Sequence, residues 1–200
     1  MRNGGNLVAK SKFSVKTLCI VSVMAALCFA ATYFLRIELP GTRVHFGAAI
    51  CMLAALLFGP LIGGLTGAIG MSMTNLLGTA LGAVDAPFTF IMRFVQGFFC
   101  GWIAWGGIKG GKPPSFARSV FACAAAAAIY FALFMIKSYF ELRLFGNTHE
   151  ATLAIIAAQR VWPSVMNAIT NPAVAVLVAP VLRRALIKSR IDTGHNRAPV

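Results

Sequence analysis

The feature that most constrains this chain is a series of long apolar stretches in which charged residues are almost absent. Charged residues make up 12% of the 200 residues, whereas a soluble domain carries roughly 25%. A helix needs about 20 apolar residues to cross a bilayer, where it satisfies its own backbone polar groups. We therefore expect an all-α integral membrane protein, a bundle of six transmembrane helices. The predicted spans are residues 17–35, 46–58, 61–80, 88–105, 119–139 and 158–182.

One domain accounts for the whole chain. Six spans and their connections leave no room for a soluble catalytic domain, so we do not expect an enzyme. The predicted membrane domain covers residues 17–182, between basic tails at 1–16 and 183–200. A basic tail before an apolar stretch is also typical of a signal peptide, but no soluble sequence follows, so we interpret 17–35 as a span. We expect the short second span, 46–58, to be tilted or to begin within the preceding loop.

The net charge of +13 is compatible with nucleic-acid binding, but the basic residues lie beside and between the apolar stretches. Twelve Lys and Arg fall in the two tails and in the loop after the fourth span, all on the N-terminal side of the membrane, and three fall in the loops on the other side. Cytoplasmic loops of membrane proteins are enriched in Lys and Arg. Both termini are therefore predicted to be cytoplasmic, and the basic residues to interact with the lipid bilayer rather than with nucleic acid.

The five cysteines all lie inside apolar stretches, without the spacing of a metal site or of a disulfide framework. They are Cys19, Cys28, Cys51, Cys100 and Cys123. We interpret them as small apolar side chains in helix packing. His45 alone gives little support for a metal, because no second ligand stands at a fixed spacing from it. No metal or cofactor is therefore predicted.

Acidic residues are scarce, and none lies in the middle of a predicted span. The five are Glu38, Asp85, Glu141, Glu150 and Asp192. Proton-driven carriers usually keep a carboxylate within the membrane, and intramembrane proteases can use paired carboxylates, so both classes are disfavoured. The segment from Gly106 to Lys112 resembles the start of a phosphate-binding loop, but Pro113 stands where Ser or Thr is needed. The chain is therefore not expected to hydrolyse ATP by itself.

Three basic residues lie inside predicted spans, each in the half of the bilayer opposite the termini. They are Arg93, Lys137 and Arg160. A charge within a bilayer usually faces protein or a water-filled cavity, so these cations predict a pocket for an anionic or electron-rich ligand near the outer face. Lys137 and Arg160 could instead extend to the lipid headgroups, and Lys137 could pair with Glu141, four residues on. Arg93 could instead pair with Asp85 or with a backbone carbonyl.

Polar residues of two further groups lie in the same region. The amides within the spans are Asn75, Gln96, Asn167 and Asn171. Such amides either bond neighbouring helices or contact a ligand. The loop after the first span contains Arg36, Glu38, Arg43 and His45. This loop could cover a pocket from outside or form a solvated connection, and we take Arg43 and His45 from it as candidate ligand contacts.

Small residues recur at every fourth position on three predicted helices. The stripes are Ser22, Ala26 and Ala30 on the first, Gly59, Gly63 and Gly67 at the third, and Gly97 and Gly101 on the fourth. Such stripes allow close helix approach, and most of them serve internal packing. The stripe on the first helix could instead be a docking face for a partner protein.

The most distinctive motifs lie between His45 and Trp105. They are His-Phe-Gly at 45–47, Leu-Leu-Phe-Gly-Pro at 56–60 with a Gly-rich helix after it, and Ala-Pro-Phe-Thr-Phe at 86–90, leading to Arg93 and Cys100-Gly101. In this stretch the chain resembles the substrate-binding S components of energy-coupling factor (ECF) transporters, the micronutrient importers of bacteria and archaea. Elsewhere the resemblance rests on the six spans, the size and the charge bias.

The resemblance implies a six-helix fold with a pocket near the outer face, capped by the loop after the first helix. It implies that this chain lies in a prokaryotic plasma membrane and has three partners, namely a transmembrane coupling subunit and two cytoplasmic ATPase subunits. It also assigns the Ser22, Ala26 and Ala30 stripe to docking on the coupling subunit. One departure is Asn75, where members of this type often carry an acid.

From these features we expect the substrate-capture subunit of an ATP-driven importer of a small water-soluble vitamin. The cations favour an acid such as pantothenate or a folate, while riboflavin and pyridoxine-like compounds stay open. Two alternatives from other classes are a stand-alone secondary carrier and a membrane scaffold subunit that transports nothing.

Overall fold

The computed structural model describes residues 15–39, 42–78, 82–106, 113–145 and 150–188. Six helices and one two-stranded hairpin make up this part of the chain. In order they are α1 (Val15–Phe34), β1 (Arg36–Leu39), β2 (Thr42–His45), α2 (Gly47–Phe58), α3 (Pro60–Gly78), α4 (Gly82–Trp105), α5 (Phe116–Phe145) and α6 (Glu150–Lys188). The predicted all-α membrane bundle is confirmed. Most of the two predicted tails, at 1–14 and 189–200, lies outside the described residues.

The second predicted span is a helix, but a short one. Five of the described helices are long and apolar enough to cross a membrane, and α2 is not among them. Its 12 residues extend for about 18 Å, against roughly 30 Å of bilayer hydrocarbon. It ends at Gly59, whose φ of 96° turns the chain directly into α3.

Two segments predicted as loops are ordered. Most of the segment 36–45 forms an antiparallel hairpin in which Arg36 pairs with His45 and Glu38 with Arg43. Its β-branched residues Ile37 and Val44 face each other in this register and favour the extended conformation. Asp85, predicted in the loop before the fourth span, lies instead in the first turn of α4.

The glycine stripes pack helix against helix, as most such stripes do. A side chain at Gly63 would collide with Ala55 of α2, and one at Gly67 would collide with Cys51. On α4, a side chain at Gly97 would overlap the backbone of Gly63. Close approach of α3 to both neighbours therefore depends on missing Cβ atoms. The cysteine interpretation agrees with this core, since all five thiols are free and every one except Cys19 is buried.

Replacing Gly97 by alanine should destabilise the bundle by about 1–3 kcal/mol, because the added methyl group meets α3 backbone that has no rotamer to change. Gly78→Ala is the matched control, since among the described residues a methyl group there would meet only the flexible ends of two arginine side chains. Thermal unfolding in detergent measures both. Equal melting temperatures for the two variants would contradict this account of the α3–α4 contact.

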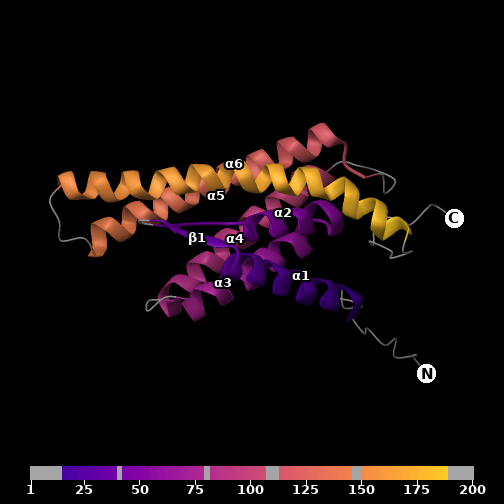
Figure 1. Ribbon diagram of the computed structural model, residues 1–200, viewed down its shortest axis with the longest axis horizontal. Coiled ribbons are helices and arrows are strands. Elements are labelled where there is room, and N and C mark those ends of the chain that lie inside the picture. Colours follow the sequence, from indigo (N-terminus) through magenta and orange to yellow (C-terminus); the bar gives the residue numbers. More distant parts are fainter. Residues whose placement is uncertain (1–14, 40–41, 79–81, 107–112, 146–149, 189–200) are drawn as a thin grey trace, which may run out of the picture.

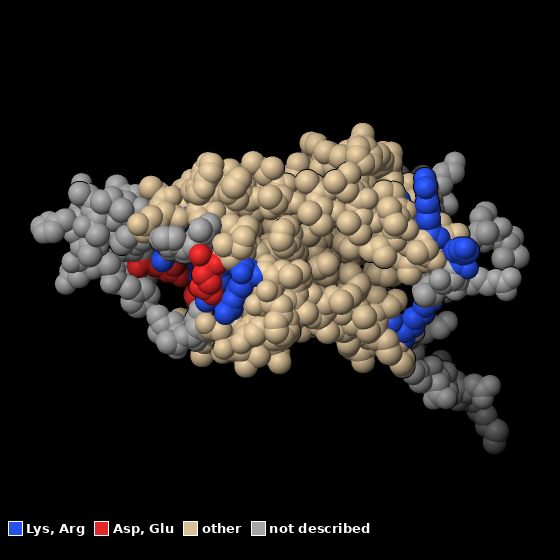
Figure 2. Space-filling model, in the orientation of Figure 1, with Lys and Arg blue, Asp and Glu red and all other residues tan. Residues whose placement is uncertain are grey.

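The two ends of the bundle differ in charge. In Figure 1, α1 begins and α6 ends at one end, which we call the terminal end, and the hairpin extends toward the opposite end, the hairpin end. Figure 2 shows Lys and Arg without visible acidic neighbours at the terminal end, whereas acidic and basic side chains lie together at the hairpin end. The hairpin end, where charges of both signs lie together, is therefore the end that offers polar groups for a ligand site.

Candidate functional site

Two adjoining hollows lie at the hairpin end, between the hairpin and helices α4, α5 and α6. Their volumes are about 230 Å³ and about 40 Å³. They adjoin each other, since five side chains line both: Arg43, His45, Arg93, Tyr130 and Phe134. Together they are close to the size of a small-molecule site.

Arg93 is a buried charged group at the junction of the two hollows. Its side chain is 5% exposed, and its guanidinium lies 3.5 Å from the centre of the Tyr130 ring. One terminal nitrogen donates a 2.7 Å hydrogen bond to Oε1 of Gln96, while the buried Nε has no hydrogen-bond partner. Among the described residues Arg93 forms no ion pair, so the alternative of a pair with Asp85 is not realised. A buried cation with a spare donor can receive an acceptor from a ligand.

His45 faces the same space from the end of β2. Its side chain is 9% exposed, and its Nδ1 is buried without a hydrogen-bond partner. Burial, and then the charges of Arg93 and Arg43, lower the pKa of His45 from 6.5 to about 3. His45 is therefore neutral at physiological pH and offers one donor and one acceptor.

The depressed pKa of His45 makes the stability of the protein depend on pH. Below pH 6.5 the unfolded chain takes up a proton at His45 that the folded protein does not accept until about pH 3. The free energy of unfolding should therefore fall by about 1.4 kcal/mol for each pH unit as the pH is lowered through this window. Melting temperatures of the protein and of His45→Gln, compared at pH 7 and pH 5, test this. A parallel decline in both would contradict it.

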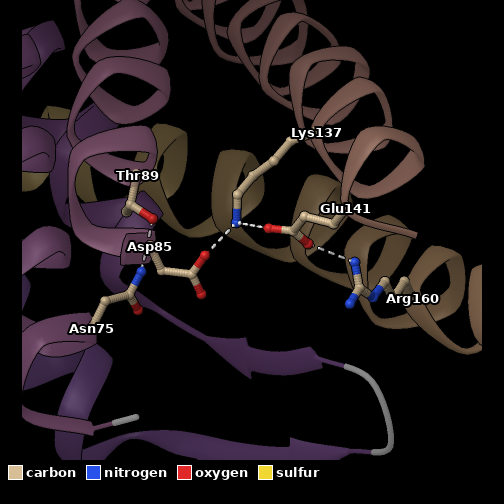
Figure 3. Close-up of polar contacts among 6 residues, drawn as sticks. All are labelled: Asn75, Asp85, Thr89, Lys137, Glu141 and Arg160. Carbon is tan, nitrogen blue, oxygen red and sulfur yellow. Dashed lines mark hydrogen bonds and ion pairs between the residues drawn. The ribbon is translucent and has the colours of Figure 1, made fainter. Parts of the chain in front are cut away.

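The other two cations within predicted spans belong to a chain of ion pairs that joins three helices (Figure 3). Lys137 of α5 bridges Asp85 of α4 at 2.8 Å and Glu141, one turn further along α5, at 2.7 Å. Glu141 in turn pairs with Arg160 of α6 at 2.9 Å. The pair of Lys137 with Glu141 is the alternative that their spacing of four residues had left open. Because both cations have carboxylate partners, they contribute less positive charge to the hollow than the sequence suggested.

Lys137→Met should lower the free energy of unfolding by about 1 kcal/mol, because it leaves two half-buried carboxylates without their shared cation. Adding Asp85→Asn should restore part of this loss, since one orphaned charge is then removed. A thermal double-mutant cycle in detergent measures the coupling. Strictly additive effects of the two substitutions on the free energy of unfolding would show that Lys137 and Asp85 do not stabilise each other.

The side-chain amides on α6 form most of their hydrogen bonds with backbone groups of the protein. Asn167 accepts a hydrogen bond from the His45 N–H at 3.1 Å and donates one to the Arg43 carbonyl at 2.7 Å. Asn171, fully buried, accepts from the Ala49 N–H at 2.9 Å. On the opposite side, Asn75 donates to Thr89 at 2.7 Å, which ties α3 to α4 beside the ion-pair chain (Figure 3).

The structure brings together nearly all of the residues that the sequence singled out. Every candidate ligand contact lines one of the two hollows except Asn171, which is fully buried. Sequence reasoning missed Tyr130 and Phe134, although they share a helical face with Lys137 and Glu141 at spacings of four, seven and eleven residues. In the described part of the chain no cluster of metal-ligating side chains occurs.

The predicted docking stripe lies away from this site, on the outside of the bundle. Ser22 and Ala26 are exposed, Ala30 is half-buried, and the first two line a shallow groove between α1 and α3. Apolar side chains, among them Phe29, Ile69 and Met73, form the rest of this groove. The stripe is therefore open to a neighbour, whereas the glycine stripes on α3 and α4 are closed by internal packing.

Comparison with known proteins gives one family and two similar folds. A family profile described as "ECF-type riboflavin transporter, S component" matches residues 12–186. A Pyrococcus woesei protein, called "Uncharacterized protein in gap 3'region", is 32% identical over 83 residues, or 40% of this chain and 54% of that protein. The chain thus spans about half the length of this curated relative.

Two solved structures share the fold. The structure titled "Structure and mechanism of the S component of a bacterial ECF transporter" is 20% identical, with a TM-score of 0.58 over 88% of this chain and 98% of that one. The structure of FolT bound with folic acid is 15% identical, with a TM-score of 0.56 over 86% and 95% of the two chains. These identities establish similarity of fold alone.

Proposed function

Because the chain belongs to the family of S components of ECF-type riboflavin transporters, we propose that it captures a small water-soluble vitamin or related micronutrient for import. The ligand binds in the adjoining hollows at the hairpin end, which faces the outside of a prokaryotic cell when both termini are cytoplasmic. A transmembrane coupling subunit and two cytoplasmic ATPase subunits then drive its release inward, because this chain is not expected to hydrolyse ATP.

The observation that carries this proposal is the pair of unsatisfied polar atoms at the junction of the hollows. Arg93 Nε and His45 Nδ1 are both buried and both lack partners. Burying a polar atom without a partner costs about 1–3 kcal/mol, so a ligand that satisfies both atoms is favoured. The neighbouring rings of Tyr130 and Phe134 suit a planar heterocycle with a hydrogen-bonding edge. Riboflavin, the vitamin in the family description, has such an edge, and so does a folate.

Identification of a copurified ligand tests the proposal most directly. Protein purified without added vitamin is denatured, and the released small molecules are identified by mass spectrometry. Riboflavin, folate and pantothenate are then titrated into ligand-free protein by calorimetry. We expect saturable binding of one of these compounds. If no ligand copurifies and no member of the panel binds, the proposal is overturned and the alternative of a scaffold subunit is favoured.

The remaining alternative is a stand-alone secondary carrier. No acidic residue lies in the middle of a predicted span, which disfavours coupling to protons. Uptake of the identified ligand is measured in cells that contain this chain with and without the coupling subunit and ATPases. Uptake that persists without them would identify the chain as a carrier.

A further inference from the structure

The side chain of Asn167 on α6 bonds the hairpin in the pattern of a neighbouring strand. Asn167 donates from Nδ2 to the Arg43 carbonyl and accepts at Oδ1 from the His45 N–H. These backbone groups come from alternate residues of β2, which in a strand direct their backbone groups to the same side. One residue of a parallel neighbouring strand would make the same two bonds. The Asn167 amide therefore replaces a third strand at the free edge of β2.

The chemistry of this contact requires a carboxamide. A carboxamide is the same group as a peptide unit and supplies both a donor and an acceptor. Aspartate would offer acceptors only, and leucine would offer neither. Oδ1 of Asn167 also receives Nδ2 of Asn171 at 3.4 Å. Three of the four hydrogen bonds available to the Asn167 amide are thus made within the protein, which leaves little for a ligand.

Asn171 extends the attachment by one helical turn. It accepts from Ala49 in the first turn of α2 and donates to the Asn167 carbonyl at 2.9 Å. Two successive turns of α6 therefore hold both β2 and the start of α2. A two-stranded hairpin alone is marginally stable, so its position depends on such contacts.

The side chains that this attachment places are those that line both hollows. Arg43 and His45, the two residues bonded through their backbone to Asn167, reach the junction where Arg93 lies. We propose that Asn167 is a positioning residue: it holds the hairpin on α6 so that Arg43 and His45 face the ligand. This inference rests on the proposed function, because it assigns a role within the same site.

Amide hydrogen exchange tests the attachment without a ligand. The chain has three histidines, so selective ¹⁵N-histidine labelling yields three backbone signals, and His45→Gln identifies the one from His45. The His45 amide of the unmutated protein should exchange far more slowly than in an unstructured peptide. Asn167→Leu, which removes both bonds at similar volume, should accelerate this exchange about fivefold to tenfold. Asn167→Gln, which keeps the carboxamide, should restore part of the protection.

Ser164→Ala is the matched control. Ser164 lies on α6 and lines the same hollow, but its hydroxyl donates to the Arg160 carbonyl of its own helix. This variant should leave the exchange of the His45 amide unchanged. If the His45 amide of the unmutated protein exchanges as fast as in an unstructured peptide, the inference is overturned. This measurement does not depend on whether Asn167→Leu folds.

Ligand binding separates a positioning role from a contact role. With riboflavin as the probe, Asn167→Leu should lower affinity about tenfold through faster dissociation, and Asn167→Gln should lower it less. Lower affinity with unchanged exchange at His45 would mean that Asn167 contacts the ligand directly, which overturns the inference. If riboflavin does not bind the unmutated protein, riboflavin is excluded as the ligand in the proposed function. The attachment of the hairpin by Asn167 is still tested, because the exchange measurement needs no ligand.

Discussion

Replacing Arg93 by alanine should weaken ligand binding about 10- to 100-fold while leaving the helical bundle folded. A hydrogen bond to a charged group contributes about 1.5–3 kcal/mol, and this cation has a buried donor to spare. The fold should tolerate the change because Arg93 forms no ion pair among the described residues. Its loss strands no buried carboxylate, in contrast to the loss of Lys137. Titration of the copurified vitamin into Arg93→Ala by calorimetry measures the effect.

Two further variants make the Arg93 result specific. Arg93→Lys keeps the charge but lacks the planar group that lies over Tyr130, so it should recover only part of the affinity. Arg118→Ala removes an arginine at the terminal end, where it bonds the carbonyls of Ile103 and Gly106, and should leave affinity unchanged. If Arg93→Ala binds the vitamin as tightly as the unmutated protein, the hollows are not the ligand site.

Replacing Ala26 by tryptophan should abolish uptake while sparing ligand binding to the isolated chain. Ala26 is exposed on α1 and lines the groove between α1 and α3, and it lines neither of the two hollows. An indole there would fill the groove and hold a partner helix away, since close approach needs small side chains. Vitamin uptake is measured in cells that contain the coupling subunit and ATPases, and binding is measured on the purified variant.

The control for Ala26 is its neighbour on the same helix. Leu27 is also exposed but is not part of the groove, so Leu27→Trp should support normal uptake. Copurification of each variant with the coupling subunit should follow the same order. If uptake survives Ala26→Trp, the first helix is not the docking face.

The ion pairs at the hairpin end show how far sequence reasoning reaches. The pair of Lys137 with Glu141 follows from a spacing of four within one helix. The partners in the other two pairs, Asp85 with Lys137 and Glu141 with Arg160, stand 52 and 19 residues apart. Their contacts depend on how α4, α5 and α6 pack. Asp85 was considered as a partner of Arg93 and not of Lys137, and it was placed in a loop although α4 has already begun there.

The amides on α6 show the same limit more sharply. An asparagine in a predicted span bonds either protein or ligand, and the sequence alone does not decide between them. Only the packed structure places the hairpin against α6, where Asn167 meets backbone groups 122 and 124 residues away. The predicted loop likewise gave no sign of a hairpin, since four-residue strands are too short for a clear alternating pattern.

The opening feature, long apolar stretches nearly free of charge, determined by itself that the chain is a helical membrane bundle. Hydropathy is a local property, and a bilayer admits helices whose backbone bonds close within one segment. The same local reasoning located the three cations within predicted spans, all of which line the larger hollow. Tertiary structure alone decided which cations are paired with carboxylates and which amides bond backbone groups. It also decided that Nε of Arg93 lacks a hydrogen-bond partner. Those outcomes depend on groups far apart in sequence, and only packing brings such groups within hydrogen-bond distance.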